Sequence, residues 1–130
     1  MGARAEYEGL IRRSDEFYLT AELQAERKMY DLAVFSLEQS LQLFLKATLL
    51  KLGVDFPRTH SVRRLLDVLS QVGGKEEIRQ LLSVYSVELG SLEDAYIVSR
   101  YVARQYTSEE FERLRVVVKR VREVVGGALG

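Results

Sequence analysis

Apolar residues recur every three or four positions along almost all of the 130-residue chain, which is the spacing of one face of an α-helix. The apolar stripes run over residues 7–21, 30–52, 62–72, 78–96 and 111–125. The second segment also carries apolar residues off its main stripe, and such a helix is usually central, with neighbours on several sides. The pattern predicts an all-α fold of five helices, arranged as an up-and-down bundle.

Glycines and capping residues mark the ends of the middle helices. Gly53 follows the second stripe, as expected where a helix ends. Thr59 or Ser61 can cap the third helix, and the pair Gly73–Gly74 ends it. The fourth stripe keeps its register across Gly90, so one long helix, bent at that glycine, is predicted rather than two.

The last segment is ambiguous by residue type. Its β-branched valines at 116–118 and 124–125 suit a strand. Thr107, however, is followed three residues later by Glu110, which has the form of a capping box at a helix start. Since the apolar residues that follow also fall at helical spacing, a fifth helix is predicted.

Composition narrows the classes of function. The chain has no cysteine and a single histidine, which argues against thiol chemistry and leaves little for a metal site, so we expect no metal and no cofactor. Nineteen basic residues balance nineteen acidic ones, so no overall field directs the protein to nucleic acid or membrane. No uncharged stretch is long enough to span a bilayer, and no apolar secretory signal begins the chain. We therefore expect one domain over residues 1–130, with its core at about 5–126, in the cytoplasm.

Charge is nevertheless uneven along the chain. Residues 57–64 contain three arginines and no acidic residue, and residues 99–130 contain seven basic against four acidic residues. Many charges of both signs, an excess of fourteen arginines over five lysines and no asparagine give a thermophile-like profile, but high genomic GC content would produce the same arginine excess. The two basic segments also hold the polar and aromatic side chains that are the best candidates for a ligand site.

The single histidine, His60, stands between Arg58 and Arg63 at the entry to the third helix. Histidine changes its charge near neutral pH, so it can serve as a ligand group or a general base beside arginines that bind phosphate. It can equally be a polar residue that hydrogen-bonds the nearby backbone. Both interpretations stay open from the sequence alone.

A second group of candidates lies at the end of the fourth helix and just beyond it: Tyr96, Arg100, Tyr101, Arg104 and Tyr106. Arginine binds phosphate bidentately, and a tyrosine ring offers a surface on which a base can stack. The alternative is a helix end with arginines near its negative pole and half-buried tyrosines. Because the third helix is about half as long as the fourth, its start is expected beside the middle of the fourth helix rather than beside Arg100.

The remaining charged candidates lie inside helices or near their starts. Lys46 stands in an otherwise apolar helix, where it can bind a ligand, reach out to solvent or pair with a carboxylate. Adjacent carboxylates occur at Glu76–Glu77, Glu93–Asp94 and Glu109–Glu110. We interpret these pairs as residues near helix starts that favour the helix dipole, so no catalytic residue is assigned.

Three stretches give the chain a resemblance to HEPN domains: Glu38–Ala47, Thr59–Leu66 and Tyr96–Tyr101. Their order and spacing are similar to those of the small stand-alone prokaryotic members, over most of the chain. The resemblance implies an up-and-down helical bundle with an additional short helix, commonly a homodimer. It also implies a nucleotide or RNA ligand and a minimal nucleotidyltransferase as partner, in a pair that often behaves as toxin and antitoxin.

The chain departs from the family at two points. Many HEPN proteins are metal-independent ribonucleases whose motif is an arginine followed, after four to six residues, by a histidine, and no such pair occurs here. Gln42–Leu43 also stands where the family usually has Glu-Lys. The resemblance therefore favours a binding protein without catalysis. A ribonuclease toxin with a rearranged site around His60, or a helical module that binds only proteins, are the alternatives.

Overall fold

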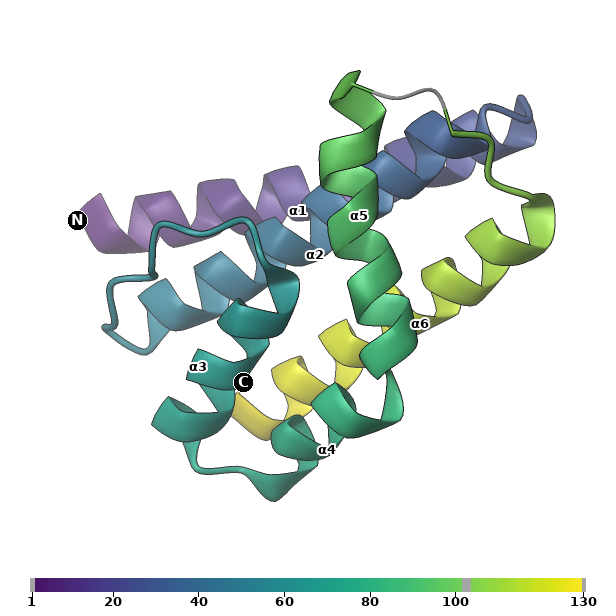
Figure 1. The fold of residues 1–130 in the computed structure, drawn as a ribbon. Coiled ribbons are helices and arrows are strands. Elements are labelled where there is room, and N and C mark those ends of the chain that lie inside the picture. Colours follow the sequence, from purple (N-terminus) through teal and green to yellow (C-terminus); the bar gives the residue numbers. More distant parts are fainter. Residues whose placement is uncertain (1, 102–103, 130) are drawn as a thin grey trace.

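The computed structural model describes residues 2–101 and 104–129, and for residues 98–101 it describes the backbone alone. Every regular element in these ranges is an α-helix, which confirms the predicted all-α class. The described ranges hold six helices instead of the predicted five: α1 (Gly2–Glu26), α2 (Tyr30–Lys51), α3 (Val62–Gly73), α4 (Glu76–Val84), α5 (Ser86–Tyr101) and α6 (Ser108–Leu129). Figure 1 shows α1 and α2 side by side, with α5 crossing them steeply.

Helices α1 and α2 form an antiparallel hairpin in which small residues meet. Ser14 Oγ donates a hydrogen bond to the carbonyl oxygen of Ser40 at 2.6 Å, and Ser40 Oγ donates to that of Ser14 at 2.8 Å. Both serines are buried, so the reciprocal bonds satisfy hydroxyl groups that would be costly to bury alone. The small side chains let the two backbones approach closely along this seam.

Helix α2 is central, as its apolar pattern predicted. It packs against α1, α3, α5 and α6, and its fully buried leucines form the middle of the core: Leu37, Leu41, Leu45 and Leu49. The same helix also buries Glu38 and Gln42. Buried polar groups need hydrogen-bond partners, so these two residues mark a polar region within the core.

The segment predicted as one long helix is two helices that meet at Tyr85, and Gly90 lies inside the second of them. Tyr85 has φ −110° and ψ 26°, outside the helical region. Bonds of the i to i−4 type nevertheless continue on both sides, from Tyr85 N–H to the Leu81 oxygen at 2.9 Å and from Leu89 N–H to the Tyr85 oxygen at 2.8 Å. The apolar stripe thus passes the break without a change of phase, which is why the spacing did not reveal it. The break lets α4 pack on α3 and α6 while α5 packs on α2.

The capping box predicted before the last helix is present. Glu110 N–H donates to Thr107 Oγ1 at 3.0 Å, and Thr107 N–H donates to Glu110 Oε1 at 2.8 Å. These reciprocal bonds satisfy donors that are otherwise free at a helix start. The segment that follows is helix rather than strand, and its core-facing side chains are Phe111, Leu114, Val117, Val118, Val121 and Val125.

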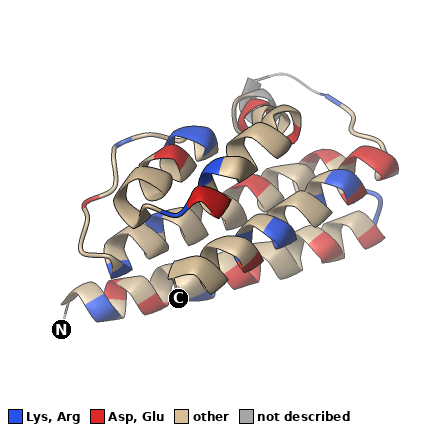
Figure 2. Ribbon diagram, turned by 90° about the horizontal axis from the view of Figure 1, so that it is seen from below, with Lys and Arg blue, Asp and Glu red and all other residues tan. Residues whose placement is uncertain are grey.

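Charged residues are mixed over the molecule. On the side seen in Figure 2, acidic and basic positions are interspersed over most of the helices. This distribution agrees with the balance of nineteen basic and nineteen acidic residues. A ligand site on this protein therefore has to arise from a local arrangement of side chains.

Candidate functional site

The start of α3 is tied to α5 through the carboxylate of Glu93. Ser61 is the N-cap of α3, since its Oγ accepts a hydrogen bond from Arg64 N–H at 3.1 Å. The same hydroxyl donates to Glu93 Oε1 at 2.5 Å, and Arg63 N–H donates to that oxygen at 3.0 Å. Of the two predicted caps, Ser61 thus serves α3, whereas Thr59 Oγ1 accepts from Ser61 N–H at 3.1 Å.

Arg63 completes this clamp from its side chain. Its Nη2 lies 2.8 Å from Glu93 Oε2, and 51% of the Arg63 side chain stays exposed. Partial burial acts to raise the pKa of Glu93, but the hydrogen bonds from the Arg63 side chain, Ser61 and the Arg63 N–H outweigh it and lower the pKa. The same contact raises the pKa of Arg63. Arg63, predicted as a ligand residue, is therefore engaged in holding α3 on α5.

The position of Glu93 corrects one expectation. Glu93 and Asp94 lie at the middle of α5 rather than near a helix start, and the helix whose start Glu93 stabilises is α3. The start of α3 therefore meets α5 at its middle. The other two pairs, Glu76–Glu77 and Glu109–Glu110, do lie in the first turns of α4 and α6, as predicted.

A row of polar side chains lies one helical turn apart on α2. Lys46 Nζ donates to Gln42 Oε1 at 2.9 Å, and Gln42 Nε2 donates to Glu38 Oε2 at 2.7 Å. Gln39 Nε2 donates to the other oxygen of Glu38 at 2.8 Å. Burial raises the pKa of Glu38 to about 7, against the opposing effect of both amides and of Lys46. Burial also lowers the pKa of Lys46, which Glu38 partly offsets.

Aromatic rings stack across the gap between α2 and α5. The His60 and Tyr96 ring centroids are 4.4 Å apart at an interplanar angle of 20°, and Phe35 lies 6.2 Å from Tyr96 at 22°. His60 Nδ1 lies 3.3 Å from Gln42 Oε1, so the histidine joins the stack to the polar row. We call Glu38, Gln42, Lys46, His60 and Tyr96 the α2–α5 site. His60 is exposed, so this site opens to solvent.

The α2–α5 site unites three of the predicted ligand residues and extends toward two more. His60, Tyr96 and Lys46 meet through Gln42. Arg58 is exposed two residues before His60, and Arg63 lies beyond Ser61 on the clamp described above. Two arginines of the basic segment 57–64 thus flank His60 in the sequence, one exposed and one paired with Glu93.

The other predicted residues divide into two sets. Arg100 and Tyr101 end α5 one turn beyond Tyr96, and their side chains lie outside the described residues. Arg104 Nη2 donates to Glu110 Oε2 at 2.9 Å, and its guanidinium lies 4.0 Å from the centre of the Tyr106 ring. Tyr106 is 6% exposed and belongs to the core, where burial raises its pKa. The described contacts of these last two residues thus support the start of α6.

Sequence reasoning missed Glu38, Gln42, Phe35 and Glu93 as site residues. Both Glu38 and Gln42 lie in the stretch Glu38–Ala47 that resembles HEPN domains, but neither was predicted as a ligand residue. A signal was present, because Glu38, Gln42 and Lys46 follow one another at a four-residue spacing on the most apolar helix of the chain. Glu93 gave no such signal, since only the contact between α3 and α5 identifies the helix start that it stabilises.

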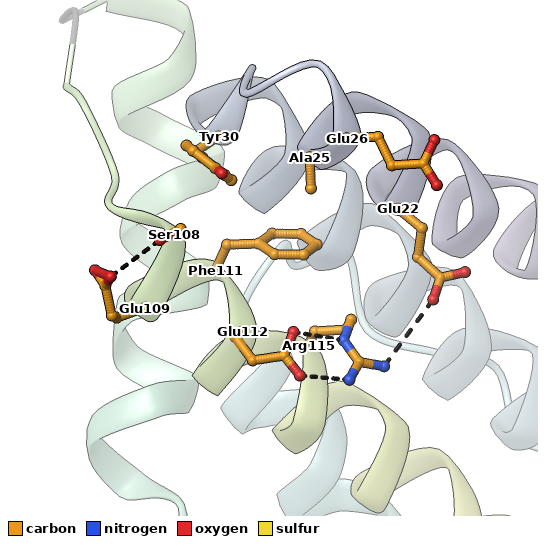
Figure 3. A pocket seen from close by; sticks show the side chains of 9 residues that line it. All are labelled: Glu22, Ala25, Glu26, Tyr30, Ser108, Glu109, Phe111, Glu112 and Arg115. Atoms are coloured by element: carbon orange, nitrogen blue, oxygen red, sulfur yellow. Dashed lines mark hydrogen bonds and ion pairs between the residues drawn. The ribbon is translucent and has the colours of Figure 1, made fainter.

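A separate open groove lies between the end of α1 and the start of α6, and it contains none of the predicted residues (Figure 3). Its charged lining is mainly acidic: Glu22, Glu26, Glu109 and Glu112. Its single arginine, Arg115, lies between two of these carboxylates, with Nη2 2.5 Å from Glu112 Oε1 and Nη1 4.0 Å from Glu22 Oε2. Carboxylates around an already paired arginine do not favour a phosphate group, so this groove is a poorer candidate for an anionic ligand.

Within residues 2–101 and 104–129, the histidine, aspartate and glutamate side chains form no group of three that could hold a metal ion. In the same ranges, no helix combines the length and the apolar composition needed to cross a membrane.

Residues 7–128 match the model of a protein family described as the HEPN domain. The match covers every residue of the α2–α5 site, including His60 and Tyr96. No curated protein matches the chain.

Proposed function

The chain belongs to the HEPN domain family, which has nucleotide- and RNA-related functions, and on that basis we propose that it binds a nucleotide or RNA at the α2–α5 site. The observation that carries this proposal is the exposed His60 ring, stacked at 4.4 Å on Tyr96. A nucleobase binds to protein surfaces of this kind by stacking on aromatic rings. In the proposed complex, the base of the ligand stacks on the exposed His60 ring, which is itself stacked on Tyr96.

Cationic groups beside the stack supply the second element of nucleotide recognition. Arg58 is exposed in the connection that carries His60, and Lys46 lies on α2 behind it. Arg63 keeps half of its side chain exposed while it holds Glu93. In this proposal Arg58 binds phosphate directly and Arg100 joins it from the end of α5, whereas Lys46 holds the Gln42 amide. Tyr101, Arg104 and Tyr106 belong to the wider ligand set proposed from the sequence.

We further propose that the protein works as a homodimer together with a minimal nucleotidyltransferase, in a toxin–antitoxin-like pair. Family membership supports this role, and exposed apolar residues on α1 offer a surface for a partner. Leu19 and Leu23 are 55% and 52% exposed, one helical turn apart on α1. Such residues also support the alternative in which the protein is purely a protein-binding module.

A second alternative, a metal-independent ribonuclease, rests on His60 as general base. The exposed ring, hydrogen-bonded on one side to Gln42, has the geometry of a positioned base. It lacks the family spacing of arginine and histidine, so an arginine from another segment would have to replace the missing partner. We therefore favour binding over cleavage.

Calorimetric titration with ATP, and with a short RNA of mixed sequence, tests the proposal. We expect saturable binding that Arg58→Ala weakens about tenfold and that is weaker at physiological salt than at low salt. Arg79→Ala is the matched control, because Arg79 is an exposed arginine on α4 whose nearest carboxylate, Glu76, lies 3.9 Å away on the same helix. Equal affinity of the two variants would contradict the site, and no heat from either ligand in the parent protein would favour the protein-binding module.

Cleavage is tested on the same RNA in the presence of EDTA. The binding proposal expects no cleavage by the parent protein. Cleavage that His60→Ala abolishes would overturn the binding proposal in favour of the ribonuclease.

A further inference from the structure

We infer that Gln42 is a positioning residue that holds His60 as its Nδ1–H tautomer, so that His60 Nε2 faces the ligand as a hydrogen-bond acceptor. The inference deepens the proposed nucleotide site and rests on it for the identity of the ligand. It assigns His60 to a donor group of the nucleotide, such as a base amino group or a ribose hydroxyl, and leaves phosphate to the arginines.

The orientation of the Gln42 amide follows from its two neighbours on α2. On one side lies the Glu38 carboxylate, which only accepts hydrogen bonds when ionised, 2.7 Å from Gln42 Nε2. On the other side lies the Lys46 ammonium, which only donates, 2.9 Å from Gln42 Oε1. An amide between an acceptor and a donor has one satisfactory orientation, in which its nitrogen faces Glu38 and its oxygen faces Lys46.

That orientation decides the proton on His60. Gln42 Oε1 has two lone pairs, of which one is used by Lys46 and the second faces His60 Nδ1 at 3.3 Å. Because Oε1 cannot donate, Nδ1 must carry the hydrogen. In a neutral imidazole the other nitrogen, Nε2, then has a free lone pair.

The aromatic stack keeps the imidazole plane in place. His60 lies nearly parallel to Tyr96, with 4.4 Å between the ring centroids, so the ring cannot turn its edge away from Gln42 without losing the stack. A turn of 180° about the Cβ–Cγ bond keeps the ring plane but exchanges Nδ1 with the carbon Cδ2, so it would lose the hydrogen bond to Gln42. No hydrogen bond to His60 Nε2 is made by any described residue, and the side chain is exposed, so the acceptor faces solvent.

The chemistry selects the kind of ligand group that fits. A lone pair accepts a hydrogen bond from N–H or O–H and repels a phosphate oxygen, which at neutral pH is itself an acceptor. Glu38 and Lys46 on α2 are linked to His60 through Gln42. Arg58 is exposed in the connection that carries His60, and Arg63 on α3 pairs with Glu93 on α5 just beyond it. The phosphate therefore goes to the basic side of the site, and the base or ribose goes to His60.

Nitrogen-15 NMR of the imidazole ring measures the tautomer directly, and the single histidine of the chain gives a single set of signals. At pH 8 we expect the protein to show the Nδ1–H form. Gln42→Leu should release His60 to the Nε2–H form that histidine favours in water. Gln39→Leu is the matched control, because Gln39 donates to the same carboxylate but does not contact His60, and its spectrum should match the parent. Gln42→Glu, which keeps an acceptor oxygen, should preserve the Nδ1–H form and covers the case in which the leucine variant fails to fold.

Titration with ATP and with inorganic triphosphate completes the test. Gln42→Leu should weaken ATP binding about tenfold and leave triphosphate binding unchanged, while Gln39→Leu alters neither. An Nε2–H signal in the parent protein overturns the inference, as does equal weakening of ATP and triphosphate. If the parent shows Nδ1–H but binds no ATP, the proposed function fails while the positioning role of Gln42 is upheld.

Discussion

Glu38 and Glu93 lie on two packed helices beside the same site, yet their surroundings act on them in opposite directions. Glu38, on α2, accepts hydrogen bonds from the neutral amides of Gln39 and Gln42. Glu93, on α5, accepts from a hydroxyl, from a backbone N–H at the start of α3 and from the guanidinium of Arg63. Burial raises the pKa of the first to about 7, whereas the partners of the second lower its pKa despite partial burial.

The contrast teaches that the partners of a carboxylate, together with its depth, decide whether it stays charged. Two neutral donors do not offset the loss of water around Glu38, whose positive neighbour Lys46 is reached only through Gln42. A charged donor and a helix start more than offset a smaller loss at Glu93. Neutralising the carboxylate of Glu38 should therefore stabilise the folded protein, whereas neutralising that of Glu93 should destabilise it.

The largest effect is expected from Glu38→Gln. The raised pKa means that the folded protein binds this proton more tightly than the unfolded chain, so wild-type stability falls as pH rises from about 4.5 to 7. At 1.36 kcal/mol per pKa unit, the fall is about 3 kcal/mol. The variant lacks this fall, so chemical denaturation should show its stability rising by that amount relative to wild type between pH 4.5 and pH 8.

The control for this variant is Glu16→Gln, the same substitution at an exposed position on α1. Its stability difference from wild type should not change over the same pH range. Parallel pH profiles for wild type and Glu38→Gln would contradict the burial of an uncompensated carboxyl group at Glu38.

The next largest effect, of opposite sign, is expected from Glu93→Gln. This change keeps an acceptor for Ser61 but removes the charge that binds Arg63 and favours the start of α3. Because the Arg63 side chain is half exposed, we expect a loss of about 1–2 kcal/mol at pH 7. A lowered pKa stabilises the fold above the unfolded pKa, so the difference should shrink and then vanish as pH falls below 4.5 and through the lowered pKa of Glu93.

Asp94→Asn is the matched control for the Glu93 variant. Asp94 is the neighbouring carboxylate, is exposed, and makes none of the bonds to Ser61 or Arg63. It should cost less than Glu93→Gln in thermal denaturation at pH 7. Equal losses would show that the clamp at the start of α3 contributes nothing specific.

The same two regions show how far the sequence could predict the structure. Periodicity identified the central α2 and the capping box at Thr107, because both signals are local in the chain. The break at Tyr85 stayed hidden because it leaves the apolar register unchanged, and Glu93 was placed near a helix start only because it belongs to a carboxylate pair. The apolar periodicity did not identify Glu38 as a site residue, although its position as a carboxylate on the most apolar helix is a signal in the sequence. Residues whose role depends on a contact between distant segments carry no local pattern, and this is why the approach of His60 to Gln42 and Tyr96 could not be predicted.

A smaller, stabilising effect is expected from Gly90→Ala, one turn before Glu93. A Cβ at position 90 would lie 3.6 Å from Arg63 Nη1, which is an ordinary contact. Alanine is favoured over glycine in a helix interior by about 0.5–1 kcal/mol. Gly9→Ala in α1, where an added Cβ meets nothing within 4 Å, gives the gain without that contact. A loss at position 90 alone, measured by thermal denaturation, would show that Arg63 needs the bare backbone to reach Glu93.

The smallest predicted effect joins the two regions. The negative charge of Glu93 contributes to the raised pKa of Glu38, so Glu93→Gln should lower that pKa and shrink the pH-dependent loss of stability in wild type. Between pH 4.5 and pH 8, Glu38→Gln should therefore raise the stability by less in the Glu93→Gln background than in wild type. The expected difference between the two gains is roughly 0.5 kcal/mol. Full additivity would mean that the carboxylates act independently. A larger gain in the double variant would mean that releasing α3 buries Glu38 more deeply, which contradicts a clamp that closes the site.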